Sequence, residues 1–130
     1  MIVVDSSVWI DHFSGRATRE TAALDDYLAK REVPVLVGDI VMYEVLAGTR
    51  SARALARIRV MFEGLLLVSM LGFELVPKAV TNYQALRRRG VTLGTVDMIV
   101  GTWCIENGAA LLTADRNFRP MADHLGLRLA

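Results

Sequence analysis

Four acidic side chains stand close to short apolar runs, in positions from which they could act together. Asp5 comes directly after the apolar residues 2–4, and Asp115 follows a second apolar run and Thr113. Glu44 and Asp97 lie in two segments of helical spacing. A buried carboxylate is costly unless it is paired or bound to a cation. Four carboxylates at close range repel one another, so at least one should stay protonated unless a divalent cation cancels the charge.

The chemistry of the available ligands narrows the choice of cation. His12 and His124 show no clear spacing relation to the acids, and Cys104 lies on an apolar helix stripe. Only oxygen ligands remain, and these suit Mg²⁺ or Mn²⁺ rather than Zn²⁺. Mg²⁺ can hold a phosphate oxygen and activate a water molecule. The pattern therefore indicates hydrolysis of phosphodiester bonds without a catalytic histidine.

The position of each acid follows from an alternation of short apolar runs with segments of helical period. The predicted strands span residues 2–4, 34–37, 65–69, 109–113 and, weakly, 127–129. The predicted helices span residues 18–30, 39–48 (with Asp39 as the N-cap), 51–62, 73–89 and 95–107. This α/β alternation, with strands that are apolar throughout, predicts a parallel sheet covered on both faces. The active site of such a fold lies beyond the carboxyl ends of the strands, where all four acids would fall.

Each acid, taken alone, also has a purely structural explanation. Asp5 or Asp97 by itself is more readily a helix cap or a partner of the helix dipole than a metal ligand. Asp115 could simply start the turn before Arg116. Glu44 is too deep in its helix to cap it, but it could be an ordinary solvated residue. The joint pattern favours a cluster, because every acid falls at the same edge of one predicted sheet.

Length and composition limit the class of protein to which the chain can belong. The chain has 130 residues, of which 53% are hydrophobic and 22% charged, which predicts one globular domain over residues 1–130. Its net charge is +1, so nucleic-acid binding would depend on local basic patches. A single cysteine excludes an internal disulfide. The sequence offers no signal peptide and no apolar run long enough for a membrane span, which predicts a soluble cytoplasmic protein.

Three segments of the chain resemble the ordered motif blocks of a known family. They read MIVVDSSVWIDHF, VGDIVMYEVLAGTR and TVDMIVGTWCIENGAALLTADRNF. They resemble the PIN-domain ribonucleases and, more narrowly, the VapC toxins of type II toxin–antitoxin systems, over nearly the whole length. The resemblance implies an α/β/α sandwich with a five-stranded parallel sheet. It also implies an endoribonuclease that depends on Mg²⁺ or Mn²⁺, is neutralised by a cognate VapB antitoxin and forms a homodimer.

The resemblance also assigns roles to residues one at a time. Its four catalytic and metal-binding acids match Asp5, Glu44, Asp97 and Asp115. Two polar residues that accompany the acids match Ser6 and Thr113. Many relatives carry a further acid where this chain has Asn117. An amide can still coordinate or hydrogen-bond, but a second metal position would lack that carboxylate.

Basic residues are the candidates for contact with RNA. Arg50, Arg53 and Arg57 have a spacing that predicts one helix face, and Arg116 and Arg119 flank the fourth acid. The run Arg87–Arg89 is a further candidate. A basic helix face is often only solvated, so Arg116 leads because it directly follows Asp115.

Apolar residues could serve a partner, although the hydrophobic core is the stronger explanation for each. Met42, Met61 and Met70, with Leu46, Phe62 and Leu66, could line a groove for an antitoxin helix. Residues at helical spacing are more often core. Trp9 and Trp103 are likewise predicted to lie in the core or at a dimer interface, and not to stack on bases.

Three other functions are weaker alternatives. A noncatalytic PIN-like module that binds RNA or protein should lack one of the core acids, and none is missing here. A phosphoacceptor receiver domain should carry an aspartate after the third strand, where this chain reads VSMLG. A dinucleotide-binding domain should carry G-x-G-x-x-G after the first strand, where it reads DSSVWI.

Overall fold

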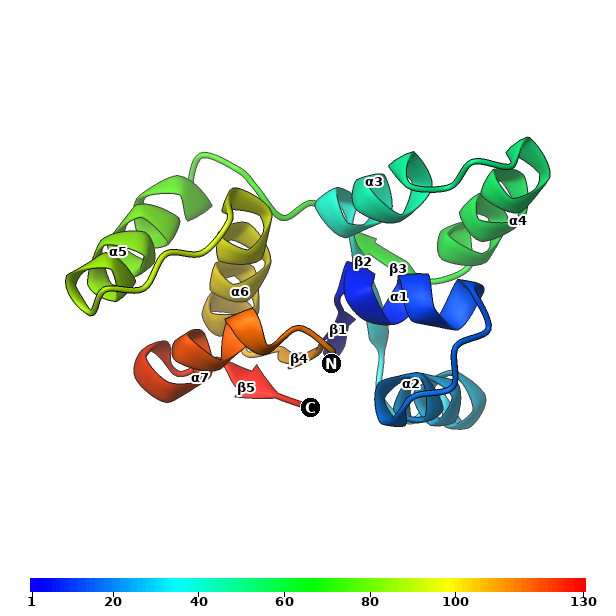
Figure 1. Cartoon of the computed structure of the whole chain (residues 1–130), viewed down its shortest axis with the longest axis horizontal. Helices are drawn as coiled ribbons and strands as arrows, with labels where there is room; N and C mark the ends of the chain where they lie inside the picture. Colours follow the sequence, from blue (N-terminus) through cyan, green and yellow to red (C-terminus); the bar gives the residue numbers. More distant parts are fainter.

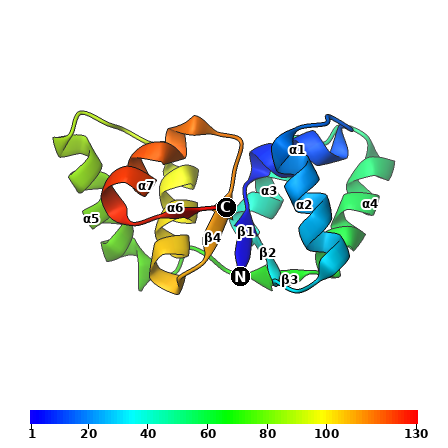
Figure 2. The ribbon, with the colours of Figure 1, turned by 90° about the horizontal axis from the view of Figure 1, so that it is seen from below.

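The protein is a three-layer α/β/α sandwich around a parallel sheet, as the sequence predicts. The computed structural model describes all residues 1–130, and its five strands are all parallel, in the order β3-β2-β1-β4-β5. The strands are β1 (Ile2–Val4), β2 (Val35–Gly38), β3 (Leu66–Val68), β4 (Ala110–Leu112) and β5 (Arg128–Leu129). Helices α1 to α4 group on one side of the sheet and α5 to α7 on the other (Figures 1 and 2).

The helices account for most of the chain between the strands. They are α1 (Ser6–Phe13), α2 (Arg19–Lys30), α3 (Asp39–Ala47), α4 (Ala52–Glu63), α5 (Leu75–Arg88), α6 (Thr95–Asn107) and α7 (Arg119–Leu125), with a short 3-10 helix η1 (Arg116–Phe118). Thr18 caps α2 and Ser51 caps α4 through their side-chain oxygens. None of these helices is both long and apolar enough to cross a lipid bilayer.

The sheet is buried at its centre and more exposed at both edges, where β3 and β5 lie. Strands β1 and β2 are buried along their whole length, which agrees with the prediction of a sheet covered on both faces. That prediction is wrong for β3, where Leu66 and Leu67 are 56% and 50% exposed. Strand β3 is an edge strand, so it has a neighbouring strand on one side only.

The pairing of the central strands brings distant residues together at the carboxyl edge. Strand β1 pairs with β2 on one side and with β4 on the other, and Val4 lies opposite Leu112. The N–H of Asp5 donates to the carbonyl of Leu112 at 2.9 Å. Asp5 and Thr113, the residues that follow these strands, therefore lie side by side although 108 positions separate them.

Some local predictions are wrong. Asp39 is the first residue of α3 rather than its N-cap, which is Gly38, and its Oδ1 accepts a hydrogen bond from the N–H of Met70 at 3.1 Å. Arg50 lies before α4, so it does not share a helix face with Arg53 and Arg57. Helices α1 and α7 were not anticipated, because each is short and buries only one or two side chains.

Two of the six apolar residues considered for a partner groove belong to the core, three are partly buried and one, Leu66, is exposed. Phe62 and Met70 are 0% and 2% exposed and belong to the main hydrophobic cluster. Trp9 is fully buried, stacks on Phe13 at a ring distance of 5.8 Å and meets Phe62 edge-on, as its predicted place in the core requires. Phe62 and Met70 therefore cannot line a groove. Met61 and Leu66 line an apolar hollow, so a groove for an antitoxin helix stays a prediction for the remaining residues.

Candidate active site

The four acids reach the carboxyl edge of the sheet from two kinds of element. Asp5 follows β1, and Asp115 follows β4 at the start of η1; we call this pair the strand-end acids. Glu44 lies in the second turn of α3, and Asp97 lies in the first turn of α6; we call this pair the helix acids. Helix α3 packs against both α1 and α6, which brings the two pairs together.

Asp5 is buried and held by two hydroxyl groups. It is 3% exposed, and its Oδ2 accepts hydrogen bonds from Ser7 at 2.7 Å and from Thr113 at 3.0 Å. Asp5 occupies the N-cap position of α1, but its side chain makes no capping hydrogen bond. The capping explanation is therefore wrong for Asp5, since its carboxylate is directed to the hydroxyls rather than to the helix N–H groups.

The segment after β4 is fixed by hydrogen bonds to the same hydroxyls. The N–H of Ala114 donates to Ser7 Oγ at 3.2 Å, and the N–H of Asp115 donates to Thr113 Oγ1 at 3.0 Å. Asp115 in turn accepts a hydrogen bond from the N–H of Asn117 through Oδ1 at 2.9 Å. Asp115 therefore starts a turn, as the purely structural explanation predicts. Its other carboxylate oxygen, Oδ2, accepts no hydrogen bond from the protein.

Ser7 is the polar residue that sequence reasoning missed. Ser6, chosen from the family resemblance, makes no side-chain hydrogen bond in the structure, whereas Ser7 contacts Asp5 and the segment after β4. Thr113 lies where the resemblance implied. Adjacent residues of a helix point about 100° apart, so the choice between the two serines needed the direction of α1.

Electrostatics joins all four acids into one site. The pKa of Asp97 is raised from 3.8 to about 6, first by burial and then by the negative charges of Asp5, Asp115 and Glu44. Neither helix acid accepts a hydrogen bond or forms an ion pair with the protein. No hydrogen bond or ion pair offsets the repulsion at Asp97, so a cation at this edge would be stabilised.

The donor set fits a divalent cation that binds mainly through oxygen. No three acidic, histidine or cysteine side chains lie close enough together in this structure to hold a metal ion between them. Mg²⁺ does not need such a cluster, because it usually keeps several waters and binds one or two carboxylates. Cys104 is no competing ligand, since burial and the charge of Asp5 raise the pKa of its thiol to about 12.

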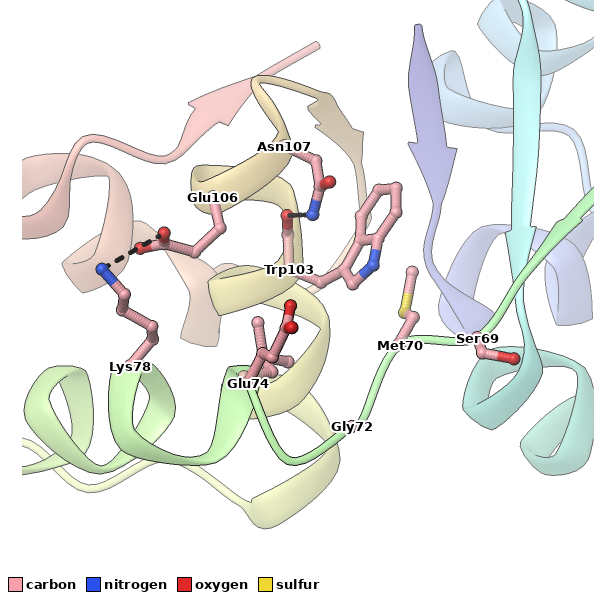
Figure 3. A pocket seen from close by; sticks show the side chains of 9 residues that line it. Ser69, Met70, Gly72, Glu74, Lys78, Trp103, Glu106 and Asn107 are labelled. Atoms are coloured by element: carbon pink, nitrogen blue, oxygen red, sulfur yellow. Dashed lines mark hydrogen bonds and ion pairs between the residues drawn. The ribbon is translucent and has the colours of Figure 1, made fainter.

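A hollow on α6 lies apart from the four acids. Its volume is about 380 Å³, and it lies between the β3–α5 connection and the C-terminal half of α6. Figure 3 shows the Trp103 ring directed from α6 toward Met70, and Lys78 paired with Glu106 at 3.7 Å. None of the four acids lines this hollow. Trp103, half-buried, therefore lines a separate hollow.

The arginines beside the site are exposed and have no carboxylate partner. Arg116 and Arg119 form no ion pair, although Asp115 directly precedes Arg116. The same is true of Arg53, Arg57 and the run Arg87–Arg89, whereas Arg59 pairs with Glu63. The free guanidinium groups could therefore meet an anionic ligand without first breaking an ion pair.

Comparisons with known proteins agree with the geometry. The model of the PIN domain matches residues 2–123. Ribonuclease VapC11 of Mycobacterium tuberculosis is 25% identical over 133 residues, which cover 100% of this chain and 98% of the relative. Among solved structures, VapBC2 of Rickettsia felis, bound to a DNA fragment from its promoter, has a TM-score of 0.81 at 14% identity and covers 100% and 98% of the two chains.

A second solved structure has the same fold. VapC20 of Mycobacterium tuberculosis, described as a sarcin–ricin loop cleaving toxin, has a TM-score of 0.70 at 15% identity over 92% of this chain and 94% of the other. The parallel α/β/α architecture and the family resemblance predicted from the sequence are thus both confirmed. The chain belongs to the PIN-domain family.

Proposed function

We propose that this protein is a VapC-type toxin, an endoribonuclease that hydrolyses RNA in the cytoplasm with the help of Mg²⁺. The observation that carries the proposal is the meeting of Asp5 and the Asp115 segment at the carboxyl edge, beside the helices that carry Glu44 and Asp97. The pKa of Asp97, raised to about 6 first by burial and then by the charges of the other three acids, supports it. Such a site favours a divalent cation. The PIN-domain family and the ribonuclease relatives support RNA as the substrate.

The chain's own residues would share the work of binding. Asp5, Glu44, Asp97 and Asp115 would hold Mg²⁺, or Mn²⁺ in its place. The bound cation would supply charge neutralisation, activation of water and stabilisation of the negative charge that develops on the phosphate. Ser7 and Thr113 hold Asp5 in place, so at least one ligand needs little rearrangement when the cation binds.

Arg116 and Asn117 are the residues best placed to meet the RNA next to the acids. Arg116 is exposed and unpaired, and a guanidinium group can bind a phosphate through two parallel hydrogen bonds. Asn117 can hydrogen-bond with its side-chain amide, since only its backbone N–H is used, by Asp115. Arg119 adds a second positive charge on the following helix.

A cognate VapB-type antitoxin and a second copy of this chain are the proposed protein partners. Similar solved structures are described as VapBC from Salmonella typhimurium and a toxin–antitoxin complex from Klebsiella pneumoniae. A toxin that cleaves cellular RNA requires an inhibitor in the same cell. The antitoxin would block cleavage when mixed with the purified protein.

The decisive experiment measures cleavage of total cellular RNA by the purified protein. We expect cleavage in Mg²⁺ or Mn²⁺, none in EDTA, and none by Asp97→Asn in any condition. Asp123→Asn is the matched control, because Asp123 is an exposed aspartate that pairs with no residue. Cleavage in EDTA, or equal cleavage by Asp97→Asn, would contradict the proposal. RNA binding without cleavage would favour a noncatalytic module instead.

A further inference from the structure

Ser7 joins the first acid to the segment that carries the fourth, although Ala114 is 107 positions away in sequence. Its hydroxyl oxygen lies 2.7 Å from Asp5 Oδ2 and 3.2 Å from the backbone nitrogen of Ala114. We infer that Ser7 is a positioning residue, which orients the Asp5 carboxylate and the Asp115 segment for a divalent cation. This inference depends on the function proposed above.

A count of protons fixes the direction of each hydrogen bond. A hydroxyl has one proton and a carboxylate only accepts, so Ser7 donates to Asp5 and accepts from the N–H of Ala114. Thr113 is arranged in the same way between Asp5 and the N–H of Asp115. With both protons used, the 3.5 Å separation of the two hydroxyl oxygens carries no hydrogen bond. Each hydroxyl therefore links one backbone N–H of the segment to the same carboxylate oxygen.

The two hydroxyls use one oxygen of Asp5 and leave the other for a ligand. Both contact Oδ2, and no protein donor contacts Oδ1. Trp9 Nε1 is the only fully buried side-chain nitrogen or oxygen that lacks a hydrogen-bond partner. Asp5 Oδ1, which also accepts no hydrogen bond from the protein, is therefore not fully buried and retains some exposure. A carboxylate held at one oxygen by two donors keeps the other oxygen in a fixed direction, as a metal ligand requires.

Removal of the Ser7 hydroxyl should loosen this arrangement without unfolding the protein. Ser7→Ala deletes the shorter of the two hydrogen bonds to Asp5 and leaves the N–H of Ala114, an exposed residue, to bond with water. Thr113 still holds Oδ2, so Asp5 stays in place but gains rotational freedom. Loss of a hydrogen bond to a metal ligand typically lowers metal affinity about 10- to 100-fold.

The test compares Mn²⁺ binding by calorimetry in the native protein and three variants. Ser6→Ala is the matched control, because Ser6 lies in the same turn of α1, is half-buried like Ser7 and makes no side-chain hydrogen bond. We expect Ser7→Ala to bind Mn²⁺ about 10- to 100-fold more weakly. Ser7→Thr, which keeps the hydroxyl, and Ser6→Ala should bind as the native protein does. Equal affinity of Ser7→Ala and Ser6→Ala would overturn the inference.

A second measurement separates this inference from the proposed function. In the ¹H–¹⁵N spectrum of the metal-free protein, the amide signals of Ala114 and Asp115 should move in Ser7→Ala and not in Ser6→Ala. If these signals do not move although the native protein binds Mn²⁺, the role of Ser7 fails and the function stands. If the amide signals move but the native protein binds no Mn²⁺, the hydrogen bonds of Ser7 orient the segment for no cation. The inference about Ser7 and the proposed function then both fail.

Discussion

The strand-end acids and the helix acids are supported in different ways. Asp5 and Asp115 accept hydrogen bonds from hydroxyl and backbone donors, which fix their orientation. Glu44 and Asp97 accept none, and the pKa of Asp97 is raised to about 6. One half of the site is therefore held by the fold itself, whereas the other half presents negative charge that the fold leaves uncompensated.

The two pairs of acids therefore contribute differently to the site: one pair is fixed in position, and the other supplies negative charge. Hydrogen bonds to a carboxylate offset the cost of removing it from water, so a buried acid such as Asp5 can be held in one position. An acid without such bonds stays dependent on a cation or a proton for its neutralisation. The strand-end acids thus define where a cation would sit, and the helix acids supply the charge that would attract it.

The same isosteric change in the two halves should have opposite effects on stability. Asp97→Asn removes repulsion and no hydrogen bond, so the metal-free protein should gain about 1 kcal/mol after allowance for solvent screening. Asp5→Asn replaces charge-assisted hydrogen bonds by weaker ones, so it should lose about 1–2 kcal/mol. Both changes should reduce RNA cleavage more than about 100-fold, because each removes a charge that we propose binds the cation. Thermal melting in EDTA and cleavage assays would measure the two effects.

Asp123→Asn again provides the control for both measurements. If Asp5→Asn and Asp97→Asn shifted the melting temperature in the same direction, the hydrogen bonds to Asp5 would not offset its burial. The distinction between the two pairs of acids would then be lost.

The arginines beside each half provide a second test of the comparison. Arg116 follows a strand-end acid, whereas Arg53 and Arg57 lie on α4, which packs against the helix of Glu44. If RNA crosses the strand-end side, Arg116→Gln should remove one phosphate contact. The slope of the logarithm of the binding constant against the logarithm of the salt concentration should then become shallower by about 0.7. The paired variant Arg53→Gln/Arg57→Gln should leave the slope unchanged.

Binding would be measured with single-stranded RNA in Ca²⁺, or with the Asp97→Asn variant, so that no strand is cut. If the variant Arg53→Gln/Arg57→Gln changes the slope more than Arg116→Gln does, the RNA crosses the side of the helix acids instead. Arg59→Gln is the matched control, because Arg59 lies on the same helix but already pairs with Glu63 at 3.1 Å.

The sequence was sufficient to predict the parallel sheet and the edge of the sheet at which the acids lie. That the four acids hold one cation stays a prediction. Short apolar runs identified all five strands, and the parallel arrangement predicted that Asp5 and Asp115 follow strands at the same edge. The structure adds that β1 and β4 are neighbours, which brings Asp5 beside Thr113. The helical spacing around Glu44 and Asp97 placed both acids near the same edge. These inferences succeeded because hydrophobic periodicity and connection rules act over whole elements.

Details that depend on the direction of a side chain were not predictable. Ser6 and Ser7 are equivalent by residue type, and only the course of α1 decides that Ser7 reaches Asp5. The exposure of Leu66 depends on β3 being an edge strand, which strand composition does not determine. The position of Arg50 outside α4 likewise depended on the exact start of that helix.

The smallest expected effect is a dependence of metal-free stability on pH. The pKa of Asp97 is 3.8 when the chain is unfolded and about 6 when it is folded, so the native state binds more protons between these values. The free energy of unfolding should therefore fall as pH rises from about 4 to about 6, and then level off. Because other carboxylates also titrate, the useful quantity is the difference in melting temperature between Asp97→Asn and the native protein.

In EDTA, that difference should be near zero at pH 4 and should reach about 2–5 °C in favour of the variant above pH 6. With saturating Mg²⁺ it should vanish or change sign, since the cation replaces the proton as the partner of Asp97 only in the native protein. A difference that is independent of both pH and Mg²⁺ would mean that Asp97 does not feel the other three carboxylates. The helix acids would then contribute no excess charge, and the division between geometry and charge would not hold.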